Sequence, residues 1–300
     1  MVHDHSHRST QVSGRNMAIA IILNIIITIG QVIGGLISGS VALLSDALHN
    51  FSDVVSLILS YITNRLAKRK STEQQTYGFK RAEIISAFVN SATLIAIAIY
   101  LIVEAVERFI NPKEVDYDIV IYFAIGSIII NLISVIILHR DSKDNMNIKS
   151  AYLHLLTDVL TSVAVMIGGL LMKYFGIYRI DSILSVLIAI YLIFSSYKLT
   201  FESIKILMQF TPKNLDVKDL CNSICELDEV VNTHHVHLWQ LNDKDIFFEA
   251  HIDLHNDIRI TEFQEILIKI EDIMDRYHIH HFNIQPEFNR DDNKNIIVEH

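Results

Sequence analysis

Six long apolar stretches crowd the first 210 residues of the chain. Each contains roughly 20 mostly apolar residues, which is the length that an α-helix needs to cross the hydrocarbon core of a bilayer, about 30 Å thick. Since backbone polar groups cannot be left unpaired in lipid, such segments are expected to form a bundle of membrane-spanning helices. The expected spans cover residues 17–38, 41–63, 83–106, 118–138, 151–173 and 180–208.

The basic residues predict how these spans are oriented. Cytoplasmic loops of membrane proteins carry an excess of Lys and Arg. The N-terminal arm and the loops after the second and fourth spans contain eleven such residues, against four in the remaining loops. We therefore expect both termini in the cytoplasm. Residues 1–16 are expected to form a cytoplasmic arm rather than a cleavable signal peptide, and its tract of His3, His5 and His7 either chelates metal weakly or has no transport role.

Ionisable residues recur inside two of the expected spans. The pattern Leu-His-x-x-[Ser/Thr]-Asp-Val contains His49 and Asp53 in the second span, and His154 and Asp158 in the fifth. A charged group inside a span costs about 2.5–3.5 kcal/mol on insertion scales, so it indicates a function or a partner that compensates. Residues four apart share one face of a helix. Each span therefore presents an imidazole and a carboxylate on the same face.

Two such faces turned toward each other would form a four-coordinate site of two nitrogens and two oxygens. This ligand set suits tetrahedral Zn²⁺, whereas Mg²⁺ and Ca²⁺ prefer six or more oxygens. Cd²⁺, Co²⁺, Fe²⁺ and Mn²⁺ remain alternatives. These ligands bind metal only when deprotonated, so the site is expected to exchange metal for protons. Asp46, one turn before His49, is expected either to orient a ligand or to cap a polar pocket.

The chain becomes polar and acidic from Pro212 onward, where 19 of the 34 acidic but only 8 of the 25 basic residues lie. Such a domain is not expected to bind nucleic acid, which requires a basic face. Residues 212–288 are expected to form a small cytoplasmic α+β domain with helices on one face of a sheet. Residues 289–300 are polar and expected to be disordered. The expected αββαβ elements are a helix at 215–227, strands at 230–241 and 247–254, a helix at 260–277 and a strand at 281–288.

Two further segments, together with the paired His/Asp motifs, carry a resemblance to a known family. Tyr77-Gly78-Phe79-Lys80-Arg81-Ala82-Glu83 leads into the third span, and His234-His235-Val236-His237-Leu238-Trp239 opens the soluble domain. The chain resembles the cation diffusion facilitator family over nearly its whole length. The resemblance implies a homodimer in the inner or plasma membrane, each protomer having a six-helix bundle and a metallochaperone-like cytoplasmic domain.

The resemblance also implies an activity and its residues. The expected function is secondary active efflux of Zn²⁺ from the cytoplasm by proton antiport. The transport site would consist of His49, Asp53, His154 and Asp158, and a histidine at position 49 resembles the zinc-selective members of the family. No enzymatic reaction is implied.

Nine of the fifteen histidines lie in the acidic domain. The resemblance favours His234 and His251 as ligands of a cytoplasmic metal site, completed by the last strand. Ile284 stands where a histidine is expected, so Glu287 or His281 would have to replace it. The alternative is that these histidines are surface residues.

Two functions of other classes compete with transport. A metal-dependent membrane enzyme would normally keep one open position at its zinc and supply a general base, and it often carries a His-Glu-x-x-His motif, which this sequence lacks. A metal sensor anchored by its spans would leave two His/Asp pairs inside the membrane without a role. Both are less favoured than transport.

Overall fold

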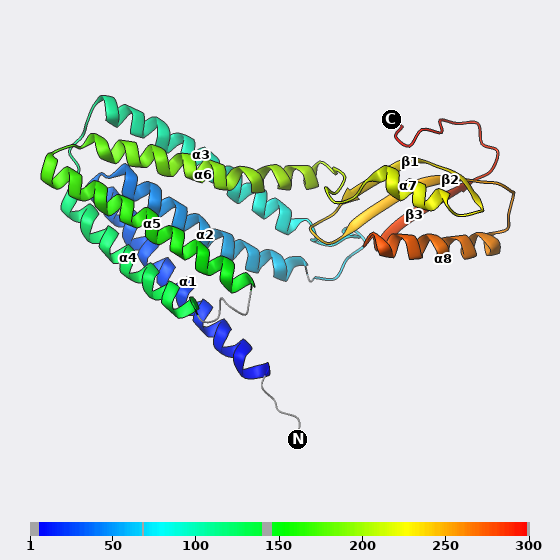
Figure 1. Cartoon of the computed structure of the whole chain (residues 1–300), viewed down its shortest axis with the longest axis horizontal. Coiled ribbons are helices and arrows are strands. Elements are labelled where there is room, and N and C mark those ends of the chain that lie inside the picture. Colours follow the sequence, from blue (N-terminus) through cyan, green and yellow to red (C-terminus); the bar gives the residue numbers. More distant parts are fainter. Residues whose placement is uncertain (1–5, 68, 140–145, 299–300) are drawn as a thin grey trace, which may run out of the picture. The chain divides into compact units, whose positions relative to one another are not determined.

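The structure is a computed structural model that describes residues 6–67, 69–139 and 146–298. It divides into two compact units, one of Met1–Tyr61 with Val89–Thr200 and the other of Ile62–Phe88 with Phe201–His300. The first unit contains most of the six long helices, and the second contains a small sheet with two helices (Figure 1). The long helices are α1 (Ser6–Ser38), α2 (Val41–Ala67), α3 (Ala82–Ile110), α4 (Tyr117–His139), α5 (Met146–Phe175) and α6 (Arg179–Leu207).

Each helix covers one of the expected apolar stretches, and α2, α3 and α5 extend beyond theirs by four or five residues at one end. The largest difference is at the start of α1. This helix begins at Ser6, so part of the expected arm is helical, although its membrane-span candidate starts only at Ile19. The sequence allows this early start, because residues 6–16 contain no proline and only one glycine, Gly14. Some residues used for the arm and the orientation lie outside the described residues: His3, His5, Lys68, Arg140 and Lys143.

Five of the helices in the described residues are long and apolar enough to cross a membrane, rather than the six expected. The exception is α2, which has 27 residues but is interrupted by polar side chains. Asp46, His49, Asn50 and Asp53 all lie within it and lower its mean hydropathy. The helix that fails a hydropathy test is therefore the one with the most ionisable groups at its centre.

A tight turn joins α1 to α2 and connects both to α6. Gly39 has a φ of +70°, a backbone conformation that favours glycine. Ser40 Oγ donates a hydrogen bond to Asp181 Oδ1 at 2.5 Å, and the Val41 N–H donates to Asp181 Oδ2 at 2.8 Å. The Asp181 carboxylate thus satisfies backbone donors at the start of α2 that have no partner within the helix.

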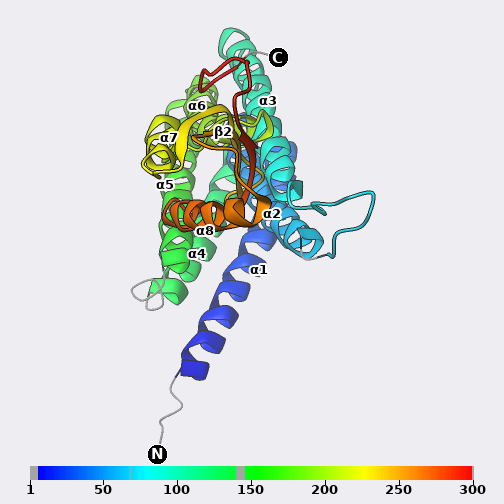
Figure 2. The ribbon, with the colours of Figure 1, turned by 90° about the vertical axis from the view of Figure 1, so that its right-hand side faces the viewer.

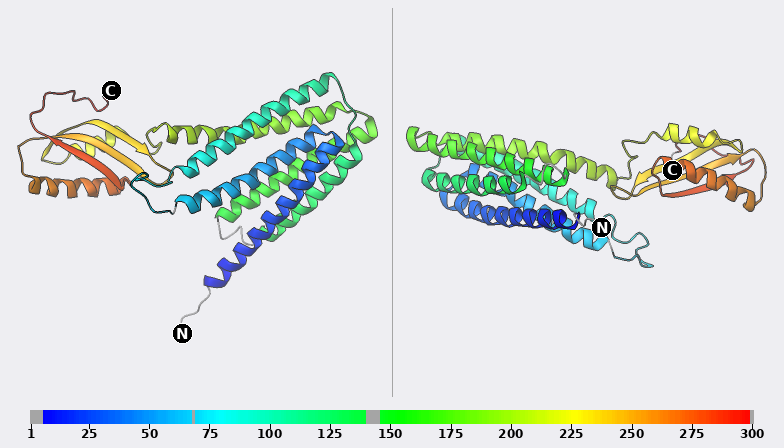
Figure 3. Two further views of the ribbon diagram at one scale, coloured as in Figure 1. Left: turned by 180° about the vertical axis from the view of Figure 1, so that it is seen from behind. Right: turned by 60° about the horizontal axis from the view of Figure 1, so that its bottom comes forward.

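Close packing of α1 against α4 depends on small residues in α1 (Figures 1 and 3). Gly30 and Gly34 both face the ring of Phe123. A Cβ atom added at Gly34 would lie 2.7 Å from Phe123 Cγ and 2.8 Å from its Cε2. Small residues four apart let helix backbones approach in lipid, and here they accommodate an aromatic ring.

Replacing Gly34 by alanine is therefore expected to lower the thermal stability of the purified protein. Overpacking costs about 1–3 kcal/mol, which exceeds the gain of up to about 1 kcal/mol in helix propensity. Gly126→Ala is the matched control, because its added Cβ would meet only Ile27 Cδ1, at 3.8 Å. Thermal unfolding in detergent should show a decrease for Gly34→Ala and none for Gly126→Ala. Equal stabilisation by both would contradict this packing.

The second unit has the expected αββαβ order: α7 (Val217–Cys225), β1 (Val230–Gln240), β2 (Ile246–Leu254), α8 (Ile260–Arg276) and β3 (His281–Glu287). The sheet order is β1-β2-β3, with β1 antiparallel and β3 parallel to β2. Alternate residues of β2, including Phe248 and Ile252, share one buried cluster with Ile224 of α7 and Ile270 of α8. Both helices therefore pack on the same sheet face, and Figure 2 shows this unit facing the viewer.

Residues 289–298, which were expected to be disordered, lie along β1 in the structure. The reason is backbone pairing that the composition did not reveal. The His235 and Val236 N–H groups donate to Asn295 O and Ile296 O at 3.1 and 2.8 Å. In addition, Ile296 packs against the hydrophobic core of the domain. Residues 289–298 are called the tail below.

Candidate metal sites

The four side chains of the two His/Asp motifs meet between α2 and α5. His154 Nε2 lies 2.9 Å from Asp53 Oδ2 and 3.8 Å from Asp158 Oδ2. His49 Nε2 lies 3.5 Å from Asp158 Oδ1 and 3.8 Å from Asp53 Oδ2. The two imidazole rings are 5.5 Å apart between centroids. Each imidazole is thus close to the carboxylate of its own helix and to that of the other helix.

The distances between these atoms match those required by a small tetrahedral ion. Ligands placed at about 2.0–2.2 Å from Zn²⁺ in a tetrahedron lie about 3.3–3.6 Å from one another. The nitrogen–oxygen distances of 2.9–3.8 Å bracket that spacing. An atom from each of His49, Asp53 and His154 can be chosen so that all lie within 4.8 Å of one another. Asp158 is not in this set, so a shell that includes it requires its side chain to move.

Two members of this cluster are buried, and their polar atoms lack hydrogen bonds in the part of the chain that the structure describes. The side chain of Asp158 is 0% exposed and that of His49 is 8% exposed, whereas those of Asp53 and His154 are 28% and 36% exposed. Both ring nitrogens of His49 and both carboxylate oxygens of Asp158 form no hydrogen bond with the described residues. A buried polar atom without a partner costs about 1–3 kcal/mol. A cation coordinated by these atoms would remove that cost.

A hydrogen-bonded network beside the cluster connects α2 to α1, α4 and α5. Gln31 Nε2 donates to Asp46 Oδ2 at 2.6 Å, and Ser162 Oγ donates to the same oxygen at 3.2 Å. Gln31 also bonds Asn50 at 2.8 Å and Ser127 at 3.1 Å. The structure therefore places Asp46 in a polar network of its own, next to the turn that carries His49.

The other two helices of the bundle also bond to α2 on its polar positions. Asn90 of α3 donates to Ser52 Oγ at 3.1 Å and to Ser56 Oγ at 2.6 Å. The Ser45 and Ser185 hydroxyls, on α2 and α6, are 2.9 Å apart. Polar contacts on several sides fix the rotation of α2 about its axis. The direction of its His/Asp face is thereby fixed as well.

A second histidine–carboxylate cluster lies on the sheet of the other unit. His234, His251, Glu287 and Asp292 each offer a ligand atom within 4.8 Å of the others. His251 Nδ1 is 2.9 Å from Glu287 Oε1, and His234 Nε2 is 3.3 Å from Glu287 Oε2 and 3.7 Å from Asp292 Oδ2. His234 is completely buried, and its Nδ1 forms no hydrogen bond with the described residues. The strand register brings these side chains together: His234 of β1 pairs with His251 of β2, and Glu287 is the last residue of the adjacent β3.

The sequence-based ligand set needs one correction here. His281 is at the opposite end of β3 from Glu287, where its ring lies 4.3 Å from that of Phe247, so it does not join the cluster. Asp292 takes that place and was missed, because the tail was expected to be disordered. The sequence feature that could have indicated Asp292 is the acidic pair Asp291-Asp292, which follows the end of β3 by only a few residues. Ile284 is buried and pairs with Ala250, away from the cluster.

Two basic side chains of the tail accompany this cluster. Lys294 Nζ donates to Asp253 Oδ1 at 2.8 Å and to Glu287 Oε2 at 3.2 Å, and it also pairs with Asp292 Oδ1. Desolvation lowers the pKa of Lys294, but hydrogen bonds to the three carboxylates outweigh it and raise the pKa above its usual value. Lys294 in turn lowers the pKa of Asp292. Arg290 Nη1 donates to Glu287 Oε1 at 2.9 Å.

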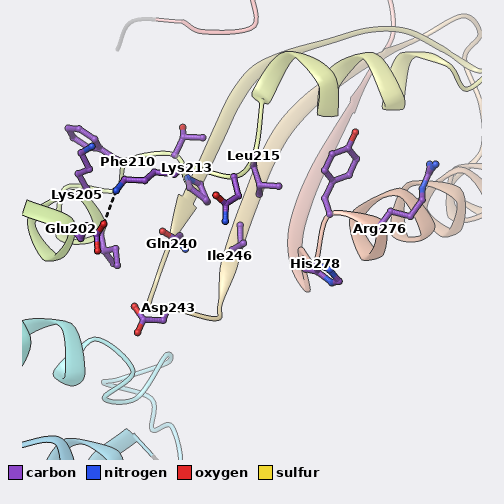
Figure 4. A pocket seen from close by; sticks show the side chains of 15 residues that line it. Glu202, Lys205, Phe210, Lys213, Leu215, Gln240, Asp243, Ile246, Arg276 and His278 are labelled. Carbon is purple, nitrogen blue, oxygen red and sulfur yellow. Dashed lines mark hydrogen bonds and ion pairs between the residues drawn. The ribbon is translucent and has the colours of Figure 1, made fainter. Parts of the chain in front are cut away.

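A cavity of about 620 Å³ opens elsewhere in the second unit, beside the end of α6 (Figure 4). Charged side chains of both signs line it, and Lys213 Nζ donates to Glu202 Oε1 at 2.8 Å within it. None of the members of the two histidine–carboxylate clusters lines this cavity. The candidate metal sites are therefore the two clusters.

Comparisons with known proteins divide the chain between residues 208 and 212. A family profile described as the cation efflux transmembrane domain matches residues 17–208, and one described as the cytoplasmic domain of cation efflux proteins matches residues 212–288. The chain is 36% identical to a cadmium, cobalt and zinc/H(+)-K(+) antiporter of Bacillus subtilis, over 99% of this chain and 96% of that protein. It is 33% identical to the zinc transporter ZitB of Escherichia coli, over 96% and 93% of the two chains. It is 30% identical to the metal cation efflux system protein CzcD of Cupriavidus metallidurans, over 94% and 89%.

Proposed function

This chain belongs to the cation diffusion facilitator family of membrane metal transporters, and on that premise we propose that it exports Zn²⁺ from the cytoplasm in exchange for protons. The observation that carries the proposal is the meeting of His49, Asp53, His154 and Asp158 between two helices of the bundle. These residues would hold the transported ion. The names of relatives support the ion class, since they include zinc, cadmium and cobalt transporters.

The ligand chemistry favours Zn²⁺ among the divalent ions. Two imidazole nitrogens and two carboxylate oxygens form a small tetrahedral set, which Zn²⁺ accepts without distortion. Mn²⁺ prefers more oxygen ligands, and Mg²⁺ requires octahedral oxygen coordination. Cd²⁺ and Co²⁺ are alternative substrates, as the name of the Bacillus relative suggests.

The same ligands provide a mechanism for coupling metal to protons. His49 and His154 can bind metal only as neutral imidazoles, and Asp53 and Asp158 only as carboxylates, so protons and metal compete for the same atoms. A site that opens toward the more acidic solution would gain protons and release its ion. When it returns to the cytoplasmic side, it would release those protons and bind metal again. Exchange then requires no group beyond the four ligands.

The remaining parts of the proposal concern assembly and the second cluster. We place the protein in the inner or plasma membrane with both termini cytoplasmic, as the distribution of Lys and Arg indicates. Its cytoplasmic domain would hold two protomers together as a homodimer. His234, His251, Glu287 and Asp292 would bind a second metal ion with a regulatory role.

Proteoliposomes test the transport mechanism directly. With Zn²⁺ outside and a fluorescent zinc indicator inside, the initial rate of entry should rise several-fold when the lumen is made more acidic than the medium. The reason is that lumenal protons displace the ion from its ligands. An ionophore that collapses the pH gradient should remove the increase, and liposomes without protein provide the background.

The possible failures have different meanings. Zinc entry that ignores the imposed gradient would refute proton coupling but leave transport intact. Absence of zinc entry above background, with folded protein in the membrane, would refute transport of this ion. The same assay with Cd²⁺, Co²⁺ or Mn²⁺ outside, and entry measured for that metal, would then identify a different substrate.

A further inference from the structure

The tail returns across the cytoplasmic domain to β1, the strand that supplies His234 to the second cluster. The N–H groups of His235 and Val236 donate to Asn295 O and Ile296 O. Asn232 Nδ2 donates to Lys294 O at 3.3 Å. The tail is therefore attached to β1 through three consecutive carbonyl groups.

β1 can accept the tail because its pairing with β2 is interrupted at this point. The register shifts between His234 and His237, and His235 has a φ of +52°. Such an irregularity leaves an extra residue outside the ladder, and its backbone groups need other partners. The tail supplies those partners one residue after the buried ligand candidate His234. A change in the tail would thus be transmitted to the position of this cluster.

The side chain of Lys294 extends from the tail into the cluster. Its Nζ contacts Glu287 Oε2 at 3.2 Å, His234 Nε2 at 3.5 Å and Asp292 Oδ1. These contacts involve three of the four residues that can coordinate a metal. Its fourth partner, Asp253 Oδ1 at 2.8 Å, lies beside them. The ammonium group therefore contacts atoms of His234, Glu287 and Asp292 that a metal ion in this cluster would also use.

We propose that Lys294 is an internal competitor for the cytoplasmic metal site, and that metal binding expels it and detaches Lys294–Ile296 from β1. The proposal rests on the proposed metal site at His234, His251, Glu287 and Asp292. A divalent ion carries twice the charge of an ammonium group and coordinates the imidazoles directly. Both cations cannot hold Glu287 Oε2 and His234 Nε2 at once, because they would lie within a few ångströms of each other in a shared shell.

Asp292 and Lys294 have opposite fates in this exchange. Asp292 would stay as a ligand of the metal, while the ammonium two residues later would be repelled from it. The three carbonyl contacts with β1 come from Lys294 and the two residues after it, and in this proposal they break when the Lys294 side chain leaves the cluster. The ordered tail would thus signal an empty cytoplasmic site, and a released tail would signal a filled one.

Hydrogen–deuterium exchange on the full-length protein in detergent tests the release. Peptides covering residues 230–241 report the amides of His235 and Val236, which the tail protects. Addition of Zn²⁺ should increase their exchange at least severalfold, and a chelator should reverse it. In Lys294→Met these amides should exchange fast even without zinc. Lys269→Met is the matched control, because Lys269 pairs with Glu229 in the same domain, outside the cluster, and should leave the exchange unchanged.

Zinc affinity provides the second measurement. The proteins carry Asp158→Asn so that chelator competition reports the cytoplasmic site. Lys294→Met removes the competitor. If the Lys294 ammonium group fills the site in most molecules of the parent protein, this variant should bind zinc on the order of tenfold more tightly, because apparent affinity scales with the fraction of molecules whose site is free. Lys294→Arg should keep binding close to that of the parent protein.

The results separate failure of the competitor from failure of the site. Zinc bound with equal affinity by Lys294→Met and its parent, with the β1 amides still protected, would overturn the competition but keep the site. His234→Ala should lower the zinc affinity of both the parent protein and Lys294→Met. If it lowers neither, the proposed cytoplasmic site itself is wrong.

Discussion

Asp158→Ala is expected to reduce the initial rate of Zn²⁺ transport in proteoliposomes by more than about 100-fold. Mutation of a residue that only supports a metal ligand already costs about 10–100-fold, and Asp158 is a proposed ligand itself. Its side chain is fully buried and neither carboxylate oxygen has a hydrogen bond with the described residues, so no other group is ready to replace it. Loss of Asp158 would also leave His49 without its nearest partner, 3.5 Å away.

The control for this prediction is Asp118→Ala. Asp118 lies in the first turn of α4 of the same unit, where its half-exposed carboxylate pairs with Lys173 at 2.7 Å. Exposed ion pairs contribute about 0–1 kcal/mol, so this variant should transport zinc at close to the normal rate. Thermal unfolding of both purified variants establishes that they are folded. A folded Asp158→Ala protein with normal zinc flux would exclude the four-residue cluster as the transport site.

The helices of the bundle were predictable because the bilayer limits their length and composition. An apolar run of some 20 residues has few alternatives to a spanning helix, and short turns such as the one at Gly39 force neighbouring helices to be antiparallel. The start of α1 was missed because hydropathy locates the part of a helix that lies in lipid, and α1 continues beyond it. The polarity that distinguishes α2 was itself readable, since His49 and Asp53 stand out in an apolar run.

The convergence of two motifs was also predictable, whereas their surroundings were not. Helical periodicity places His154 and Asp158 on one face, and repetition of the pattern in α2 indicates a shared partner. Nothing in the spacing reveals that Gln31 of α1 holds Asp46, because that contact joins residues of different helices. Such contacts depend on how the helices are rotated, which composition does not determine.

In the cytoplasmic cluster, the ligand candidates on strands could be predicted from the sequence, but the one outside a strand could not. His234 and His251 were both named from the family resemblance, and the strand register brings them together. Asp292 was outside any periodic element, and only the three-dimensional course of the tail takes it there. A polar segment can be ordered when a strand irregularity offers unpaired backbone groups, a condition that sequence patterns do not show.

His49→Asp is expected to change which metal is transported rather than to abolish transport. The substitution converts a site of two nitrogens and two oxygens into one of a single nitrogen and three oxygens, with one more negative charge. Oxygen-rich sites suit Mn²⁺, and imidazole suits Zn²⁺. The ratio of Zn²⁺ to Mn²⁺ transport in proteoliposomes should therefore fall by at least about tenfold, a change of about 1.4 kcal/mol in relative stabilisation. Cd²⁺ belongs in the same panel, because it tests the tolerance for a larger ion.

His49→Asn separates the gain of a carboxylate from the loss of the imidazole. Asparagine resembles aspartate in size but brings no charge, so it should lower the flux of every metal without favouring Mn²⁺. His49 is central enough for this comparison, because it is nearly buried and its Nε2 lies within 3.8 Å of both cluster carboxylates. If His49→Asp and His49→Asn have the same metal preference as the parent protein, the ion is selected elsewhere along the path, and His49 serves only to position α2.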